Sequence, residues 1–313
     1  MSESATNPPA SSFFEPGTLW EKTNQKTKSA RKCGALESIE TKYQLIQQED
    51  ISFVVRTLCN LAKKERAAKQ QSQEEKKTGK RIDPFLPYEP ELFVADISDS
   101  HFCLLNKFNV VDNHLLIVTR AFEEQTDLLN LQDFAALWSC LQEIDGLAFY
   151  NGGKIAGASQ RHKHLQLIPL PFMADGVYLP IERAIANVSF QDSWGTISSF
   201  SFRHGVASLD FSSADSANTA AEIMLQQYHN LLNKVGLEID SQTQQPGAYN
   251  FLATRNWMLI VPRSLASFAN IPINSLGFAG SLFVRDRDSL ELLKNLTPLK
   301  LLEKVTFSLK THK

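Results

Sequence analysis

Cysteine is scarce in this 313-residue chain, which contains four cysteines that lie far apart: Cys33, Cys59, Cys103 and Cys140. They form no CxxC pair, so the sequence contains neither a zinc knuckle nor a dithiol redox motif. Free thiols of a reducing compartment are therefore expected.

The sequence also lacks a charge excess and a long apolar run. Lys and Arg number 32 against 34 Asp and Glu, which argues against a nucleic-acid or membrane-surface binder. The first residues, MSESATNPPASS, show neither a basic nor an apolar signal region. With 43% hydrophobic residues, the composition predicts a globular cytoplasmic protein of one large or two modest domains, with a frayed N-terminus.

The hydrophobic pattern alternates between strands and helices. In the first half, a hairpin is predicted from 101–108 and 114–119, followed by a helix through Phe134 and Ile144 that stops at Gly146, and a strand at 147–153. The second half has a helix that ends at Gly236, a hairpin from 249–254 and 257–263, and a helix at 288–296. Antiparallel pairs interleaved with helices indicate an α+β protein, with two halves that form similar subdomains.

Two segments are expected to contribute little to the core. Residues 1–35 are predicted to be disordered or irregular. The charged, glutamine-rich run 63–81 has no apolar face, so it is predicted to be a solvated segment, either a mobile surface loop or the polar end of a helix. The remaining chain divides into an N-terminal half, 36–185, and a C-terminal half, 186–313.

The stretch NGGKIAGASQRHKHLQLIPLP, residues 151–171, combines a glycine-rich loop with regularly spaced polar residues. On a strand, His162, His164 and Gln166 share one face, which we expect to meet solvent, a metal or a ligand, while Lys163 and Leu165 share the other. The glycines allow close approach to an anion, and backbone N–H groups and the Ser159 hydroxyl can donate to it, which suits phosphate. Neither GxxxxGK[ST] nor GxGxxG is present, so the two common nucleotide-binding loops are absent.

The residues alone allow three interpretations of the histidine pair. A closed metal site would need further ligands, and the other histidines, His101, His114, His204 and His229, show no supporting spacing. The rings could also be buried and bonded to the backbone. The third reading is an imidazole that attacks phosphorus and forms a covalent intermediate.

The HKHLQ motif resembles the active-site strand of the histidine triad superfamily in its transferase variant, in which glutamine replaces the last histidine. Together with LLNKFNVVDNHLLIVT, YNGG, GASQRHKHLQ, YNFLATRNWMLIVPR and INSLGFAGSLFVR, it is similar to ATP adenylyltransferases, also called diadenosine tetraphosphate phosphorylases. The resemblance covers most of the chain from about Glu40 onward. It implies a histidine-triad-like fold, an antiparallel sheet with flanking helices, whose C-terminal half completes a nucleotide cleft.

The resemblance implies roles for individual residues. His164 matches the nucleophile that holds AMP, Gln166 would bond the phosphoryl oxygens, and His162 would orient the nucleophile. The positions that match substrate-binding residues of the family are Lys64, Asn106, Lys107, Asn151, Gly157, Ala158, Ser159, Gln160, Asn274, Ser275, Leu276, Ser281 and Arg285. The chain departs from the family pattern at Glu65, where a proline is expected, which leaves Lys63 and Lys64 as alternatives, and at Arg285, where a lysine is usual.

The expected reaction is reversible cleavage of diadenosine tetraphosphate by inorganic phosphate to ATP and ADP, with sulfate as a further acceptor. A neutral Gln166 supplies no proton, which favours phosphate over water as the acceptor. No organic cofactor or dedicated metal site is expected, and Mg²⁺ would enter as the counter-ion of the nucleotide. The partners would be dinucleoside polyphosphates, ATP, ADP and phosphate. A hexose-1-phosphate uridylyltransferase and a non-catalytic nucleotide sensor remain alternatives, and the sequence does not indicate an oligomeric state.

Overall fold

The computed structural model describes residues 14–58, 82–173, 177–239 and 243–309, together with the isolated positions 69, 73, 77 and 79. Its main sheet has nine strands in the order β3-β4-β5-β7-β6-β10-β11-β9-β8. All pairs within this sheet are antiparallel. The strands are β3 (Phe93–Asp96), β4 (His101–Leu105), β5 (Leu115–Thr119), β6 (Gly146–Gly152), β7 (His164–Pro169), β8 (Trp194–Gly195), β9 (Gly205–Ser208), β10 (Tyr249–Ala253) and β11 (Trp257–Pro262).

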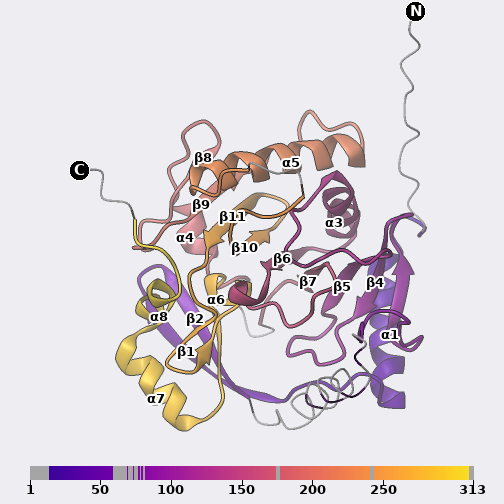
Figure 1. Cartoon of the computed structure of the whole chain (residues 1–313), viewed down its shortest axis with the longest axis horizontal. Helices are drawn as coiled ribbons and strands as arrows, with labels where there is room; N and C mark the ends of the chain where they lie inside the picture. Colours follow the sequence, from indigo (N-terminus) through magenta and orange to yellow (C-terminus); the bar gives the residue numbers. More distant parts are fainter. Residues whose placement is uncertain are drawn as a thin grey trace, which may run out of the picture.

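Helices α1 (Leu19–Cys33), α3 (Leu131–Glu143) and α5 (Ala217–Lys234) belong to one hydrophobic cluster with the strands of the main sheet. In Figure 1, α5 lies across the top of the molecule, α3 lies at the upper right, and α1 lies beside β4. The amide oxygen of Asn130 accepts from the backbone N–H groups of Gln132 and Asp133, and the Asp133 carboxylate accepts from the Asn130 N–H, so a capping box starts α3. Ser216 caps α5 through the backbone N–H of Thr219.

A second cluster covers the other face of the sheet. It includes residues of a small sheet, β1-β2-β14, in which β2 pairs antiparallel with β1 and parallel with β14. Figure 1 places this sheet with α7 and α8 at the lower left. The remaining elements are β1 (Thr41–Gln48), β2 (Ile51–Leu58), the 3₁₀ turn η1 (Lys154–Ala156), α4 (Glu182–Ala186), β12 (Ser267–Phe268), β13 (Ile271–Pro272), α6 (Ser275–Phe278), β14 (Ser281–Val284), α7 (Arg287–Leu296) and α8 (Pro298–Lys304).

The predicted α+β class and both hairpins are confirmed, since β4 pairs with β5 and β10 with β11. The two halves contribute to one continuous sheet, joined where β6 pairs with β10. Cys33, Cys103 and Cys140 are free thiols, as expected. Among the described residues, none of the helices combines the length and apolar character needed to cross a bilayer.

Three local predictions were wrong. Residues 1–35 were expected to be irregular, but α1 forms, because Leu19, Thr23, Thr27 and Ala30 recur at helical spacing and are buried. Gly146 does not stop α3; it is the first residue of β6, and the helix ends at Glu143 with Ile144 already extended. Helix α8 was missed: no helix was predicted after 288–296, whereas Pro298 occupies the first turn of a new one. Apart from the isolated positions, the run 63–81 lies outside the described residues.

Candidate active site

The centre of the site is β7, which lies between β5 and β6 in the main sheet. Leu165 and Leu167 point into the cluster that contains α3 and α5. Lys163 is also fully buried, and its Nζ lies 2.6 Å from Oδ2 of Asp133 and 3.0 Å from Oε2 of Glu123. The predicted alternation therefore holds for Lys163 to Leu167, and it leaves His164 and Gln166 on the opposite face of the sheet.

His164 is held by contacts that fix its ring orientation. Its Nδ1 donates to the backbone oxygen of His162 at 2.8 Å, and its backbone N–H donates to Oε1 of Gln125 at 2.9 Å. The ring of Phe85 packs edge-on against it, with centroids 5.0 Å apart. A carbonyl oxygen can only accept, so the proton sits on Nδ1 and the Nε2 lone pair of the neutral ring is available. Within the described part of the chain, no protein group bonds this Nε2 atom.

Burial and the neighbouring charge of His162 lower the pKa of His164 to about 4, against the opposing effect of its backbone hydrogen bond. The imidazole is therefore neutral at physiological pH. A neutral ring with a free Nε2 lone pair is the form that a nucleophile requires.

The expectation that His162, His164 and Gln166 share one open face was wrong for His162, because its ring is buried. The ring is 1% exposed; its Nδ1 lies 2.7 Å from Oδ2 of Asp83, and its Nε2 lies 2.8 Å from the backbone oxygen of Thr119. Because β7 begins only at His164, the alternation does not extend back to residue 162. His162 instead contacts His164 through its backbone carbonyl.

Gln166 is oriented by a chain of hydrogen bonds that begins at the backbone of Phe108. The Phe108 N–H donates to Oδ1 of Asn106 at 3.3 Å, so the Asn106 Nδ2 points to Nδ1 of His114, also at 3.3 Å. An amide nitrogen only donates, which places the ring proton of His114 on Nε2, and this atom donates to Oε1 of Gln166 at 3.0 Å. The Nε2 amide group of Gln166 is left to donate elsewhere.

His114 and Gln125 were missed in the sequence as parts of this site. His114 was considered only as a metal ligand, and its contact with Gln166 arises because β5 pairs with β7 in a register that sets Leu115 opposite Leu167. Gln125 belongs to a loop, and its Nε2 also donates to the backbone oxygens of Asn151 and His164. A histidine at the start of an apolar strand was the available signal for His114; we find no comparable signal for Gln125.

Asn151, at the end of β6, is buried and ties this strand, which precedes the predicted phosphate loop Gly157 to Gln160, to the C-terminal half. Its Oδ1 accepts from Nδ2 of Asn250 and from the backbone N–H of Ser275, both at 2.9 Å. Its own Nδ2 has no hydrogen-bond partner among the described residues. The amide is therefore fixed through its oxygen, and its nitrogen remains available to donate to a ligand.

The predicted loop Gly157 to Gln160 follows η1 directly. Gly157 has φ +95° and lies against Asn274, and Ser159 is exposed. Asn274 caps α6 by accepting from the backbone N–H of Leu276, and Ser275 is fully buried beneath Asn151. The structure thus brings the loop together with the predicted segment 274–276, although these are far apart in the sequence.

Other predicted residues are less closely tied to this cluster. The Nζ of Lys107 lies 2.7 Å from Oε1 of Glu89, Ser281 is buried within β14, and Arg285 is exposed just beyond the end of that strand. Lys64 and its alternative Lys63 lie outside the described residues. The substrate-binding roles of these positions stay predictions.

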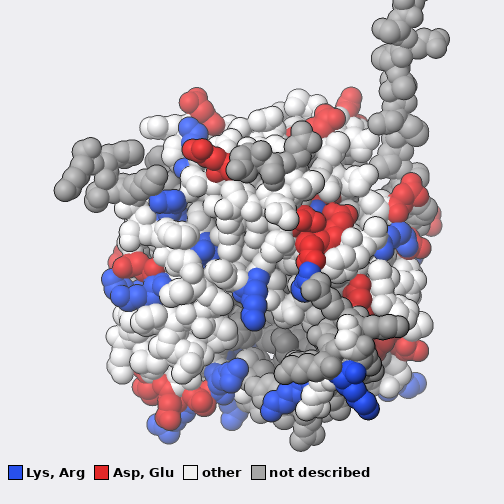
Figure 2. Space-filling model, in the orientation of Figure 1, with Lys and Arg blue, Asp and Glu red and all other residues white. Residues whose placement is uncertain are grey.

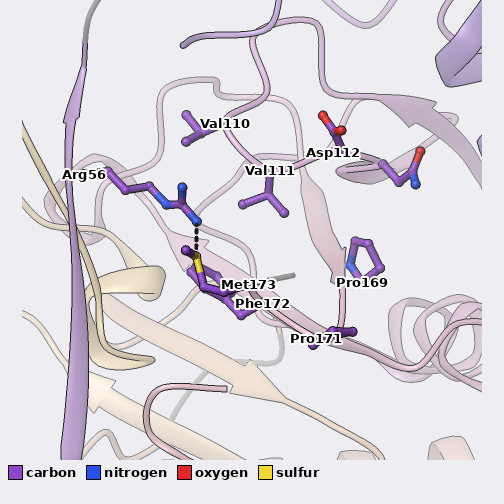
Figure 3. A pocket seen from close by; sticks show the side chains of 9 residues that line it. Arg56, Val110, Val111, Asp112, Pro169, Pro171, Phe172 and Met173 are labelled. Carbon is purple, nitrogen blue, oxygen red and sulfur yellow. Dashed lines mark hydrogen bonds between the residues drawn. The ribbon is translucent and has the colours of Figure 1, made fainter. Parts of the chain in front are cut away.

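Two cavities, each of about 380 Å³, flank the strands that carry the site. One lies beyond the end of β7 and is lined by Pro169, Phe172, Met173 and Arg56, whose guanidinium donates to the Met173 sulfur (Figure 3). The other lies beside the phosphate loop and is lined by Gly152, Gly153, Lys154, Ile155, Thr126 and the 244–248 segment. Figure 2 shows a hollow near the centre of one face, with Lys and Arg side chains near it and a group of Asp and Glu side chains above it.

Comparison with known proteins places the chain among nucleotide transferases. Residues 9–187 match the family model described as the Ap4A phosphorylase N-terminal domain, and residues 198–308 match the ATP adenylyltransferase C-terminal domain. The chain is 29% identical over 304 residues to diadenosine 5',5'''-P1,P4-tetraphosphate phosphorylase 2 of Saccharomyces cerevisiae, which covers 88% of this chain and 90% of that protein.

Solved structures agree with the sequence comparison. The crystal structure of the yeast Ap4A phosphorylase Apa2 matches with a TM-score of 0.74 and 26% identity, covering 94% of this chain and 96% of that one. Apa2 in complex with AMP matches with a TM-score of 0.73 and 26% identity, covering 94% of this chain and 99% of that one. Apa2 in complex with Ap4A matches with a TM-score of 0.72 and 25% identity, covering 93% of this chain and 97% of that one.

Proposed function

Since the chain belongs to the Ap4A phosphorylase family of ATP adenylyltransferases, we propose that it cleaves diadenosine tetraphosphate with inorganic phosphate to ATP and ADP. The observation that carries this proposal is the neutral His164, whose Nε2 is free, beside a Gln166 amide that His114 holds in place. The similarity to yeast diadenosine tetraphosphate phosphorylase 2 and to the Ap4A complex of Apa2 supports this choice of substrate.

In the first half-reaction, the Nε2 lone pair of His164 attacks the phosphorus next to one adenosine. A nitrogen–phosphorus bond forms, the bond from that phosphorus to the bridging oxygen breaks, and ATP leaves with the electron pair. The Nδ1 proton stays on the ring, and the His162 carbonyl that accepts it stabilises the positive charge that develops there. The amide N–H groups of Gln166 and Asn151 would donate to the two non-bridging oxygens of the transferred phosphoryl group.

In the second half-reaction, an oxygen of inorganic phosphate attacks the same phosphorus, and the nitrogen–phosphorus bond breaks. ADP forms, and the electron pair returns to Nε2. Phosphate arrives as an anion and needs no general base, whereas water would have to lose a proton that neutral Gln166 cannot accept. The same steps run in reverse, and sulfate is chemically suited to replace phosphate in the second step.

A divalent cation such as Mg²⁺ would accompany the polyphosphate as its counter-ion. Its ligands would be mainly phosphoryl oxygens and water, as is usual for magnesium bound to nucleotides. We assign no protein ligand to it and no organic cofactor to the enzyme.

Intact-mass spectrometry tests the proposal directly. Incubation with diadenosine tetraphosphate alone should add the mass of one adenylate, and phosphate should remove it as ADP appears. Absence of both the adduct and phosphate-dependent turnover would overturn the proposal. Turnover of uridine diphosphate sugars would then indicate a hexose-1-phosphate uridylyltransferase, and inactivity on both substrates a nucleotide sensor.

The rate of adenylylation by diadenosine tetraphosphate should stay almost constant between pH 7 and pH 5. The reactive form is the unprotonated imidazole, and the pKa of His164 lies at about 4, so protonation removes it only as the pH falls through that value. An ordinary histidine with a pKa near 6.5 would lose about 30-fold of its neutral form by pH 5. Single-turnover rates, with circular dichroism at each pH to verify folding, distinguish these profiles; a 30-fold loss would show that burial does not lower this pKa.

A further inference from the structure

Arg263, directly after β11, places a positive charge inside the protein behind the phosphate loop. Its side chain is 2% exposed, and its Nη1 donates to Oδ1 of Asn250 at 2.5 Å and to the backbone oxygen of Ala156 at 3.4 Å. The remaining acceptors are the backbone oxygens of Ile273, Leu265 and Val305. All of these acceptors are neutral, and within the described chain no carboxylate forms an ion pair with this guanidinium.

A buried cation without a counter-ion is costly, and among the described residues the equally buried Lys163 is paired. Lys163 has two carboxylates within 3.0 Å, those of Asp133 and Glu123. Arg263 lacks this compensation, and burial lowers its pKa to about 9. An anion that binds nearby would offset the cost of such a charge.

Hydrogen bonds connect Arg263, through Asn250, to Asn151 and Ala156, which lie next to the expected anion site. Asn250, fixed by Arg263 through its oxygen, uses Nδ2 to donate to Oδ1 of Asn151 and to the backbone oxygen of Ala156. Asn151 is thereby turned so that its Nδ2 remains available, and Ala156 is the last residue of η1 before the phosphate loop. A positive charge at the start of this chain polarises each amide in the direction that strengthens donation to a phosphoryl oxygen.

We propose that Arg263 is a positioning residue that makes this site selective for the phosphoryl group, by orienting Asn151 through Asn250 and by supplying an uncompensated positive charge behind the loop. The inference rests on the proposed function, in that the anion is the phosphoryl group of a nucleotide. It concerns the affinity for that group and leaves the base and ribose unaffected.

The ratio of AMP affinity to adenosine affinity, measured by titration calorimetry, tests the inference, because the two ligands differ only in the phosphoryl group. In the Arg263→Gln protein, the ratio should fall about tenfold while adenosine affinity stays unchanged. Arg263→Lys keeps the charge and should restore the ratio to within about threefold of wild type, even with a lower melting temperature. A merely structural role would lower both affinities together.

Arg255 provides the matched control at the other end of β11. Its guanidinium also donates to backbone oxygens, those of Leu141 and Gln142, and the Arg255→Gln protein should keep the wild-type ratio. An unchanged ratio in Arg263→Gln, or an equal loss in Arg263→Lys, would overturn the inference; the Lys variant alone decides if the Gln variant does not fold. If wild-type protein bound neither AMP nor adenosine, the proposed function itself would fail.

Discussion

Replacing His164 with alanine should abolish adenylyl transfer, with a loss of about 10⁴-fold or more and no adenylate adduct in the mass spectrum. The reaction would lose the atom that bonds to phosphorus. Its described neighbours offer no substitute: the ring nitrogens of His162 are bonded to Asp83 and Thr119, and Gln166 carries no nucleophilic lone pair at its amide nitrogen. Nucleotide affinity should change much less, since Asn151 and the loop are untouched. Quenched single-turnover assays with intact-mass detection measure both the rate of adenylyl transfer and the amount of adduct.

His204 makes a closely matched control for this variant. Like His164, its Nδ1 donates to the backbone oxygen two residues before it, at 2.8 Å, and burial lowers its pKa to about 4. Its Nε2, however, accepts from the backbone N–H of Ile197 at 2.7 Å, so no lone pair is available for chemistry. His204→Ala should therefore lose stability but retain adduct formation. An adduct that persists in His164→Ala would place the nucleophile elsewhere.

The sequence contained enough local information to predict the central strand and its polar face. The HKHLQ alternation identified His164 and Gln166, and the hairpins were readable because their strands are adjacent in the chain and separated by short polar turns. Such patterns depend on the pairing of near neighbours, so no knowledge of the overall topology was needed.

The groups that orient His164 and Gln166 could not be predicted in the same way. His114 reaches Gln166 only through the register of β5 against β7, and Ser275 reaches Asn151 from the other half of the chain. Neither contact leaves a periodic pattern, because each depends on how distant segments meet. His162 shows the limit of the alternation rule, since the strand on which the rule depends begins two residues after it.

Gly157 is expected to be sensitive to substitution, although it carries no functional group. Its φ of +95° disfavours any side chain, and a Cβ there would lie 2.8 Å from both the Cβ of Asn274 and the backbone oxygen of Ile273. Gly157→Ala must therefore displace the phosphate loop or the start of α6. Either shift would move the groups that donate to the phosphoryl oxygens out of place. We therefore expect adenylyl transfer to slow by about 100-fold.

The variant Gly34→Ala is the control that distinguishes backbone strain from a steric clash of the new Cβ. It has a similar φ of +81°, but nothing lies within 4 Å of the position that its Cβ would occupy. Gly34→Ala should cost about 1–2 kcal/mol in the free energy of unfolding and leave transfer unchanged, because its strain is confined to the end of α1. If Gly157→Ala lost stability to the same extent but transferred adenylate at the wild-type rate, close contact between the loop and Asn274 would not be needed for catalysis. A 100-fold loss confined to Gly157→Ala would instead show that the C-terminal half sets the position of the phosphate loop, and hence that both halves of the chain contribute to one site.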